Sequence, residues 1–293
     1  MVKSYVTTAL RNLLRNKFYS AINIVGLTLG LAIGILILLW VHDELSYDRF
    51  NKNVDRIFKV SSAVGTGSTK QVWNGAQAPL AEYALKEVPG VKNAVRIAPR
   101  GDNEFFKYNG KTFEAGEMLY TDASIFEVFN FKWVAGNVHN PFPDKQSVVL
   151  TRSTASAFFG KNDPIGEVLV ADNNQTYTVT GITEDCPQNS SIQFDMLFPI
   201  TSIRVWDAFL SQDWSRYIFS TYLELEPNSS LNTIAKNLKR VHLKYQPLAE
   251  KEGIYILQPL TKIHLFDAEG TSLGMRTVKT LFIVALLILL IAS

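Results

Sequence analysis

Two long apolar runs interrupt an otherwise mixed pattern of apolar and polar positions. Residues 21–41 hold 16 apolar side chains out of 21, and no charged side chain lies between Phe18 and Val41. A helix of about 20 residues crosses the ~30 Å hydrocarbon layer of a bilayer. The first run therefore predicts a transmembrane helix over residues 18–42. A cleaved signal peptide is the competing interpretation, but its apolar core is usually only about 7–15 residues long, and no small-x-small cleavage site follows Trp40.

The second apolar run lies at the other end of the sequence. Residues 281–293 hold 12 apolar side chains out of 13. Thirteen helical residues span only about 20 Å, which is less than the hydrocarbon layer. We therefore expect residues 278–293 to be the start of a second transmembrane helix that is truncated at Ser293.

The segment before the first membrane helix is predicted to be a separate amphipathic helix, residues 1–17. Its apolar side chains recur at intervals of three and four, a spacing that places them on one helical face. The opposite face carries four basic side chains, which are Lys3, Arg11, Arg15 and Lys17. Such a helix is typical of the cytoplasmic surface of a membrane. The alternative is an extension of the membrane helix with a solvated basic face.

Charges flanking the first membrane helix predict its orientation. The leader before it has a charge of +4, whereas the rest of the chain sums to −2, and Asp43, Glu44 and Asp48 follow the helix directly. Basic flanks remain in the cytoplasm. We therefore expect a cytoplasmic N-terminus in the inner membrane and an extracytoplasmic domain over residues 43–277.

Three glycines recur at every fourth position of the first membrane helix, namely Gly26, Gly30 and Gly34. Small residues at this spacing share one face and let a second helix approach closely. We expect this face to pack against another helix. Because glycine is common in membrane helices, a chance pattern is the alternative.

The outward region has the pattern of a mixed α+β domain. The Asn109-Gly110 pair predicts a hairpin turn, and Gly181 predicts a bulge in a strand. Strand, helix and strand near the end of the region favour an α/β sandwich built from split βαβ units. The predicted strands are 56–64, 147–151, 176–183, 217–226, 255–260 and 263–266, and the predicted helices are 78–87 and 228–246.

Residues with catalytic or ligand-binding spacing are missing from the sequence. The chain has 29 basic against 27 acidic residues, a balance that argues against a nucleic-acid-binding protein. No Walker A motif, His-Glu-x-x-His pair or Gly-x-Ser-x-Gly elbow is present, and the single Cys186 has no intrachain disulfide partner. His264 fits a structural histidine better than a ligand. We therefore assign no catalytic, cofactor-binding or metal-binding residues and expect no enzyme activity.

Three segments together resemble the MacB/FtsX-like permeases of ABC transporters. They are residues 11–32 (RNLLRNKFYSAINIVGLTLGLA), 158–166 (FFGKNDPIG) and 179–195 (VTGITEDCPQNSSIQFD). The first resembles the N-terminal helices of these permeases, and the other two resemble recurring segments of their periplasmic core domain. By themselves, the last two segments read as turn and packing residues.

The resemblance implies a fold, partners and a function. It implies a porter-like α/β part formed by the early and late segments, with a β-rich inserted part at about residues 101–194. It also implies a separate ABC ATPase, a second copy or a homologous permease, and a periplasmic or outer-membrane partner. The function implied is the coupling of cytoplasmic ATP hydrolysis to movement of the outer domain, for export of a peptide, lipoprotein or drug. The alternative is the extracytoplasmic sensor of a two-helix membrane receptor.

Overall fold

The computed structural model describes residues 5, 7, 11, 14–65, 67–101, 104–204, 206–207, 209–247 and 254–292. The chain divides into two compact units. One comprises Met1–Ser46 with Ser272–Ser293, and the other comprises Tyr47–Thr271. Most of the predicted amphipathic helix, including Lys3, lies outside the described residues.

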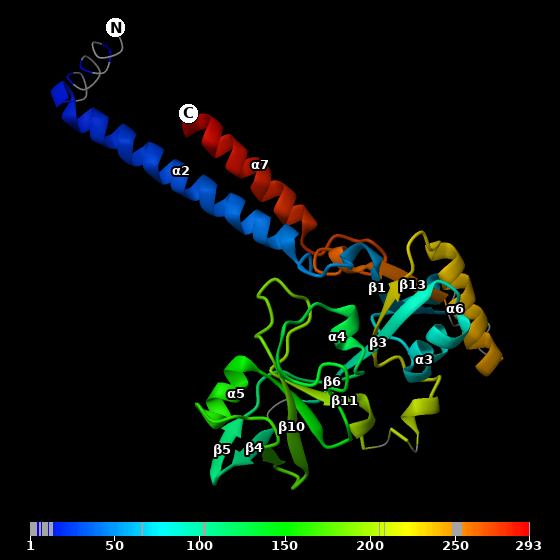
Figure 1. Cartoon of the computed structure of the whole chain (residues 1–293). Helices are drawn as coiled ribbons and strands as arrows, with labels where there is room; N and C mark the ends of the chain where they lie inside the picture. Colours follow the sequence, from blue (N-terminus) through cyan, green and yellow to red (C-terminus); the bar gives the residue numbers. More distant parts are fainter. Residues whose placement is uncertain are drawn as a thin grey trace. The chain divides into compact units, whose positions relative to one another are not determined.

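The first unit is a pair of apolar helices, α2 (Lys17–Ser46) and α7 (Met275–Ala292), which lie side by side (Figure 1). Within the described residues, α2 is the one helix that is long and apolar enough to cross a membrane, with a mean hydropathy of 2.7 over its best window. Most of its apolar side chains are exposed. Exposed apolar side chains all around a helix are stable against lipid but costly in water, which supports the predicted transmembrane helix.

The first and last segments of the second unit together form an α/β arrangement of four strands and two helices. Its strands are β1 (Ile57–Val64), β3 (Val91–Pro99), β12 (Ser220–Leu225) and β13 (Ile254–Pro259), and its helices are α3 (Ala78–Glu87) and α6 (Leu231–Tyr245). The strand order is β13-β1-β12-β3, and all three pairings are antiparallel. Strands β1 and β3 are therefore parallel with β12 between them, and β12 and β13 are parallel with β1 between them. Two interleaved split βαβ units make this a ferredoxin-like arrangement.

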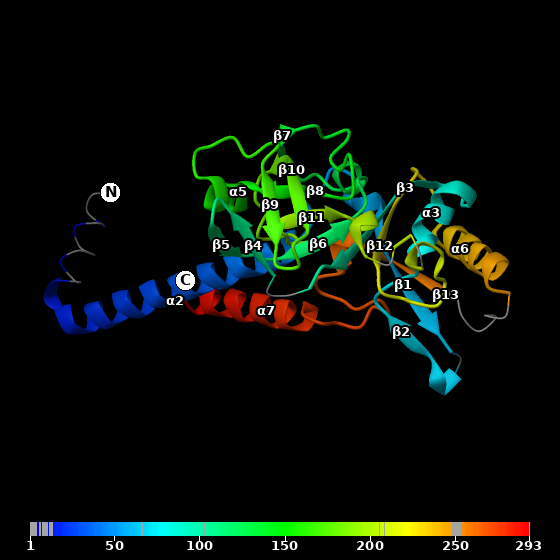
Figure 2. The same ribbon diagram turned by 90° about the horizontal axis from the view of Figure 1, so that it is seen from below.

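Helices α3 and α6 cover one face of this sheet, as Figure 2 shows. Proline at the first turn of α3 fits a position where a backbone N–H has no helical partner. Helix α6 is capped by Ser230, whose hydroxyl accepts the N–H of Thr233. The apolar face of α6 then packs on the sheet through Ile234, Leu238 and Val241.

A β-rich part is inserted between β3 and β12 and extends the same sheet. Beyond β3 the order continues as β6-β11-β8-β10-β9-β4-β5, while β2 pairs with β1 and β7 pairs with β10. A separate core of mainly aromatic and branched side chains fills this part. The remaining strands are β2 (Gln71–Trp73), β4 (Phe105–Tyr108), β5 (Lys111–Glu114), β6 (Met118–Thr121), β7 (Trp133–Gly136), β8 (Ser147–Thr151), β9 (Val168–Ala171), β10 (Thr176–Thr183) and β11 (Met196–Pro199), and the helices are α4 (Ile125–Val128) and α5 (Arg152–Phe159).

Local signals in the sequence agree with this structure except at one place. Asn109 and Gly110 both have positive φ, 48° and 73°, in the turn that joins β4 to β5. The pairing of β10 with β8 shifts register between Val179 and Gly181, which confirms the predicted bulge. The predicted extended segment 263–266 is wrong, because the chain there forms a turn after the 3₁₀ helix Leu260–Lys262. Apolar periodicity over four residues does not distinguish a strand from a packed turn.

Candidate functional site

The three glycines of α2 occupy different environments. Gly34 is buried, and a Cβ added there would lie 2.9 Å from Cδ2 of Leu289 on α7. A Cβ on Gly26 would meet nothing within 4 Å. Gly26 and Gly30 instead line an open groove between α2 and α7, with a volume of about 580 Å³. Gly34 therefore lies in the contact between the two helices, whereas the position of Gly26 leaves space for a side chain. Packing by Gly26 and Gly30 stays a prediction.

The basic side chains at and before the start of α2 make no contact that assigns them a role. Arg11, Arg15 and Lys17 are exposed. They have no ion pair with any carboxylate of the described residues. Their binding to the inner membrane surface stays a prediction, as does that of Lys3.

The side chains that could carry chemistry, such as the Cys186 thiol, lie in surroundings typical of structural residues. Burial raises the pKa of the Cys186 thiol to about 11, and the thiol donates to the carbonyl of Phe194. A thiol with this pKa stays protonated and unreactive at neutral pH. Within the described residues, no three His, Cys, Asp or Glu side chains are placed to hold a metal ion.

One buried histidine belongs to a polar cluster that the sequence did not reveal. His242 is fully buried on α6, and its Nδ1 lies 2.6 Å from the Tyr255 hydroxyl and 3.1 Å from Nε2 of Gln77. The Tyr255 hydroxyl also donates to Oε1 of Gln77. These residues come from α6, β13 and the start of α3, so only the fold brings them together. These contacts join Gln77, His242 and Tyr255 into one buried polar network.

A second buried cluster lies immediately after α2, and we call it the Asp48 junction (Tyr47, Asp48, Asn189, Ser191 and His264). Asp48 is 1% exposed and has a positive φ of 60°. Its carboxylate accepts the backbone N–H of Ser191 at 2.9 Å and the Ser191 hydroxyl at 2.6 Å. Its own N–H donates to the carbonyl of Asn189 at 2.8 Å. Burial raises the pKa of Asp48, and the hydrogen bonds from Ser191 offset this only in part.

The same junction also holds the chain that leads to α7. The rings of Tyr47 and His264 are stacked, with their centroids 3.4 Å apart and their planes 3° from parallel. Tyr47 directly follows α2, and His264 precedes α7 by eleven residues. The cluster therefore fastens the chain entering the outward domain both to the turn at 189–191 and to the chain leaving the domain. This contact gives His264 the structural role that the sequence predicted.

The sequence predicts only turns in the segment 179–195 and gives no sign of the contact between Ser191 and Asp48. Ser190 and Ser191 lie in a polar run whose local pattern shows only a turn. The partner of Ser191 is 143 positions away in the sequence. The one local signal is that Asp48, an acidic residue, follows a membrane helix closely, and that signal predicts only the orientation of the helix in the membrane.

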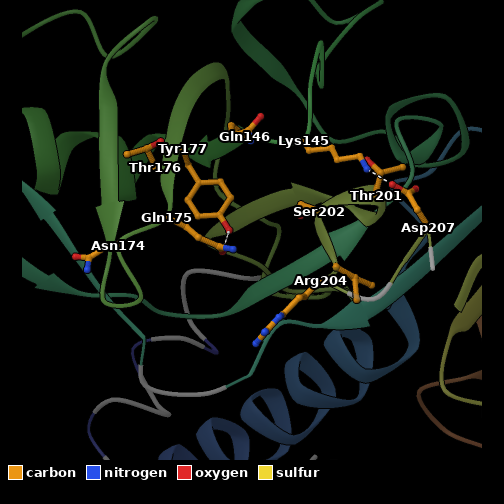
Figure 3. A pocket seen from close by; sticks show the side chains of 11 residues that line it. Lys145, Gln146, Asn174, Gln175, Thr176, Tyr177, Thr201, Ser202, Arg204 and Asp207 are labelled. Carbon is orange, nitrogen blue, oxygen red and sulfur yellow. Dashed lines mark hydrogen bonds and ion pairs between the residues drawn. The ribbon is translucent and has the colours of Figure 1, made fainter. Parts of the chain in front are cut away.

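A polar cavity of about 520 Å³ opens in the inserted part (Figure 3). Lys145 and Asp207 form an ion pair at one side, and the Tyr177 hydroxyl donates to Oε1 of Gln175 at 2.7 Å on the other. Amide and hydroxyl side chains supply most of the remaining polar surface. Among its described lining residues, no hydroxyl group is hydrogen-bonded to a basic side chain, which is the arrangement of an activated nucleophile.

Comparisons with known proteins agree with the architecture. The family model of the MacB-like periplasmic core domain matches residues 20–241. A solved domain of a putative permease from Porphyromonas gingivalis is 25% identical, with a TM-score of 0.58, covering 71% of this chain and 91% of that one. A search of curated proteins gave no match.

Two further solved structures are more distant. The periplasmic region of MacB from Actinobacillus actinomycetemcomitans is 14% identical with a TM-score of 0.48, covering 70% of this chain and 90% of that one. The extracellular domain of the noncanonic ABC-type transporter YknZ from Gram-positive bacteria is 15% identical with a TM-score of 0.48, covering 69% and 99%. The family match spans both the apolar helix α2 and most of the domain that follows it. This chain belongs to the family of ABC transporter permeases that carry a MacB-like periplasmic core domain.

Proposed function

We propose that this chain acts as a permease subunit that couples ATP hydrolysis by a separate cytoplasmic ATPase to movement of its extracytoplasmic domain. The movement serves export or extrusion of a peptide, lipoprotein or drug. The N-terminus with Arg11, Arg15 and Lys17 lies in the cytoplasm. The family membership supports a permease, and the charges around α2 support the orientation.

The Asp48 junction is the observation that carries this proposal. Asp48 lies two residues after the end of α2. Its carboxylate accepts two hydrogen bonds from Ser191. Charge-assisted hydrogen bonds of this kind are short and strong. We infer that displacement of the chain at Asp48 reaches the turn at 189–191 through these two hydrogen bonds.

Hydrogen exchange in the complete transporter tests the coupling. The permease is purified with its ATPase in proteoliposomes and compared with and without a non-hydrolysable ATP analogue. We expect nucleotide to change exchange at residues 47–53 and 187–193, and Ser191→Ala to reduce the change at 187–193 at least two-fold. Identical exchange with and without nucleotide in the wild-type complex would refute the coupling.

A second serine in the same domain provides a matched control. The backbone N–H and hydroxyl of Ser153 donate to Asp185 at 2.9 and 2.6 Å, the same geometry as at Asp48. Asp185 is exposed and does not adjoin a membrane helix. Ser153→Ala should therefore leave the nucleotide response at 187–193 unchanged, whereas an equal loss in both variants would show a non-specific effect of removing a hydroxyl.

Reporter fusions test the orientation separately. Alkaline phosphatase folds only outside the cytoplasm, because its disulfides require an oxidising compartment. A fusion after residue 60 is expected to be active, and a fusion of a cytoplasmic reporter at the same position is expected to be inactive. The opposite result would place the N-terminus outside and overturn the proposal.

A further inference from the structure

The polar cavity of the inserted part forms where the ends of three neighbouring strands meet (Figure 3). Strand β8 lies between β10, to which it is parallel, and β11, to which it is antiparallel. The residues before β8, the turn into β10 and the chain after β11 therefore lie at the same end of the strands. They supply the lining, which is residues 145–146, 174–177, 201–204 and Asp207. The volume of about 520 Å³ is within the range of roughly 300–1,000 Å³ of ligand pockets.

The charges that line this cavity do not cancel. Lys145 and Asp207 form an ion pair with each other. Arg204 is exposed and forms no ion pair with the carboxylates of the described residues. Asp207 is the one carboxylate among the described lining residues, and Lys145 already neutralises it. An anionic group that enters the cavity therefore meets a guanidinium without a competing carboxylate.

Hydrogen bonds orient the Gln175 amide so that its donors stay available. Its Oε1 accepts the Tyr177 hydroxyl at 2.7 Å and Nδ2 of Asn173 at 3.2 Å. With both donors on the oxygen, the two hydrogens of Nε2 remain for a ligand. Figure 3 shows the Arg204 side chain reaching toward the side of the cavity where Gln175 lies. A guanidinium and an amide on one side of a cavity together suit an oxyanion, which forms short charge-assisted hydrogen bonds with such donors.

The rest of the lining consists of amides and hydroxyls with little apolar surface. Gln146 and Asn174 each carry a side-chain amide, which both donates and accepts. The Ser202 hydroxyl donates to a backbone carbonyl at 2.7 Å and keeps its oxygen as an acceptor. Ile203 is the one aliphatic hydrocarbon side chain among the described lining residues. A lipid or another apolar molecule therefore gains little here, because it would bury polar groups without replacing their hydrogen bonds.

The one aromatic ring of the described lining does not offer a stacking surface. Tyr177 is 3% exposed. Its ring packs against Phe198, with the centroids 4.9 Å apart, and the Arg100 guanidinium lies 4.6 Å from its centroid. Nucleobases bind by stacking on aromatic faces, so a nucleotide is a poor fit to this cavity.

We propose that the polar cavity binds the C-terminal end of an extended peptide. The terminal carboxylate accepts hydrogen bonds from the Arg204 guanidinium and from Nε2 of Gln175. The preceding peptide groups pair with the side-chain amides of Gln146 and Asn174, which carry a donor and an acceptor in one plane, as a peptide group does. Capture of a terminal carboxylate is a recurring mode of peptide recognition. The assignment rests on the cavity itself and does not depend on coupling to an ATPase.

Arginine modification in the full chain tests where a peptide binds. The chain is purified in detergent, and mass spectrometry follows the reaction of each arginine with phenylglyoxal. The probe is a mixture of acetylated tetrapeptides of glycine, alanine, serine and threonine, made either with a free C-terminal carboxylate or as C-terminal amides. We expect the free acids to slow modification of Arg204 at least two-fold and the amides to leave it unchanged. No protection by the acids, or equal protection by acids and amides, would overturn the proposal.

Matched variants test the two proposed donors by equilibrium dialysis with radiolabelled free-acid peptides. Arg204→Gln removes a charged donor and should weaken binding about ten-fold, the size expected for a hydrogen bond to a charged group. Gln175→Glu keeps the acceptor for Tyr177 but sets a carboxylate against the ligand, so it should weaken binding at least as much. The control Arg240→Gln removes the same charge from an exposed position on α6 and should bind like wild type. Wild-type affinity in Arg204→Gln, or an equal loss in Arg240→Gln, would overturn the proposal.

Two small anions separate a peptide site from other oxyanion sites. Inorganic phosphate and glucuronate each carry an oxyanion but no peptide group. At the same concentration, each should protect Arg204 less than half as well as the free-acid peptides, because Gln146 and Asn174 then have no peptide group to pair with. Equal protection by phosphate would show a general anion site, and equal protection by glucuronate would show a sugar-acid site. Either result would overturn the assignment to a peptide.

Discussion

The two parts of the outward domain each contain a buried charge that is held in a different way. In the α/β part, the Glu224 side chain on β12 is 1% exposed. It accepts hydrogen bonds from Asn53 at 2.9 Å and from Lys92 at 3.0 Å, and Arg56 lies 3.8 Å away. Polar donors from two separate segments, residues 53–56 and β3, thus converge on this carboxylate.

In the inserted part, the buried charge is the guanidinium of Arg100, whose side chain is 3% exposed. Glu104 accepts two of its hydrogen bonds, at 2.8 and 3.1 Å, but its Nη1 has no partner. Aromatic ring faces take the place of the missing acceptor, with the ring centroids of Phe198 at 4.0 Å and of Tyr177 at 4.6 Å from Cζ. Burial lowers the pKa of Arg100, but Glu104 and the neighbouring tyrosines outweigh this, so the group stays charged.

The difference follows from the shapes of the two ions. A guanidinium is planar and weakly hydrated, so ring faces stabilise it through cation–π contact and stacking. A carboxylate has no such interaction with a ring face and needs donors at its oxygens. Arg100 lies directly after β3, where the chain enters the inserted part, and Glu224 lies on β12, with which the chain returns.

Truncation of Arg100 is expected to have the largest effect. Arg100→Ala leaves Glu104 unpaired and opens a cavity among four rings, at a cost of about 3 kcal/mol in the free energy of unfolding. Arg100→Met fills the same space and should recover at least half of that loss, because the rings accept an apolar side chain. Urea unfolding of the full chain in detergent, followed by tryptophan fluorescence, measures both. Equal losses for Ala and Met would mean that charge, not packing, dominates at this position.

Neutralisation of Glu224 is expected to have a smaller effect. Glu224→Gln keeps the shape and one acceptor but loses the attraction of Lys92 and Arg56, which are partly exposed. We expect a loss of about 1–2 kcal/mol in the same unfolding measurement. Glu226→Gln, an exposed neighbour on the same chain segment, is the control and should change stability by less than about 0.5 kcal/mol. A loss at Glu224 no larger than at Glu226 would contradict the role of converging donors.

Asp48 lies between these two cases, since it has donors but its pKa is raised by burial. The folded protein therefore holds the proton more tightly than the unfolded chain. The stability that protonated Asp48 contributes is fully present below its unfolded pKa of about 3.9 and is lost as pH rises through its folded pKa. The advantage of wild type over Asp48→Asn should fall by about 1 kcal/mol or less as pH is raised from 4 to 7 in urea titrations. A growing advantage would show that Ser191 outweighs burial.

An exposed ion pair provides the lower limit of the series. Arg152 pairs with Glu184 at 2.7 Å, with both side chains at least 40% exposed. Exposed pairs are screened and contribute about 0.2–1 kcal/mol. Arg152→Ala should therefore lower the free energy of unfolding by no more than about 0.5 kcal/mol, and 0.5 M salt should abolish the difference. A salt-independent loss would indicate lost packing by the arginine stem.

Local patterns identified much of the fold. Apolar content predicted the membrane helix, because a bilayer imposes a minimum length on any crossing segment. Turn chemistry identified the hairpin at Asn109-Gly110 and the bulge at Gly181, since both depend on the residues at the turn itself. The one clear error, at 263–266, occurred where a four-residue pattern was too short to distinguish a strand from a turn.

The site residues were less accessible to sequence reasoning. The glycine spacing on α2 indicated a packing face. Only the structure shows that a Cβ on Gly34 would touch Leu289, whereas a Cβ on Gly26 would have nothing within 4 Å. Asp48 and Ser191, and Arg100 and Phe198, are each separated by more than about 90 residues. Neither pair has a local signature.

By itself, the sequence determined that an apolar helix precedes a mixed α+β domain without recognisable catalytic motifs, and its motifs indicated the permease family. Those properties depend on composition, periodicity and short-range turns, which are set by residues close to one another in the sequence. The tertiary structure decided which polar residues meet just after α2 and how the buried charges of Glu224 and Arg100 are compensated. Such contacts depend on sheet order, because β1, β3, β12 and β13 come from distant parts of the chain and only their pairing sets the distances between side chains.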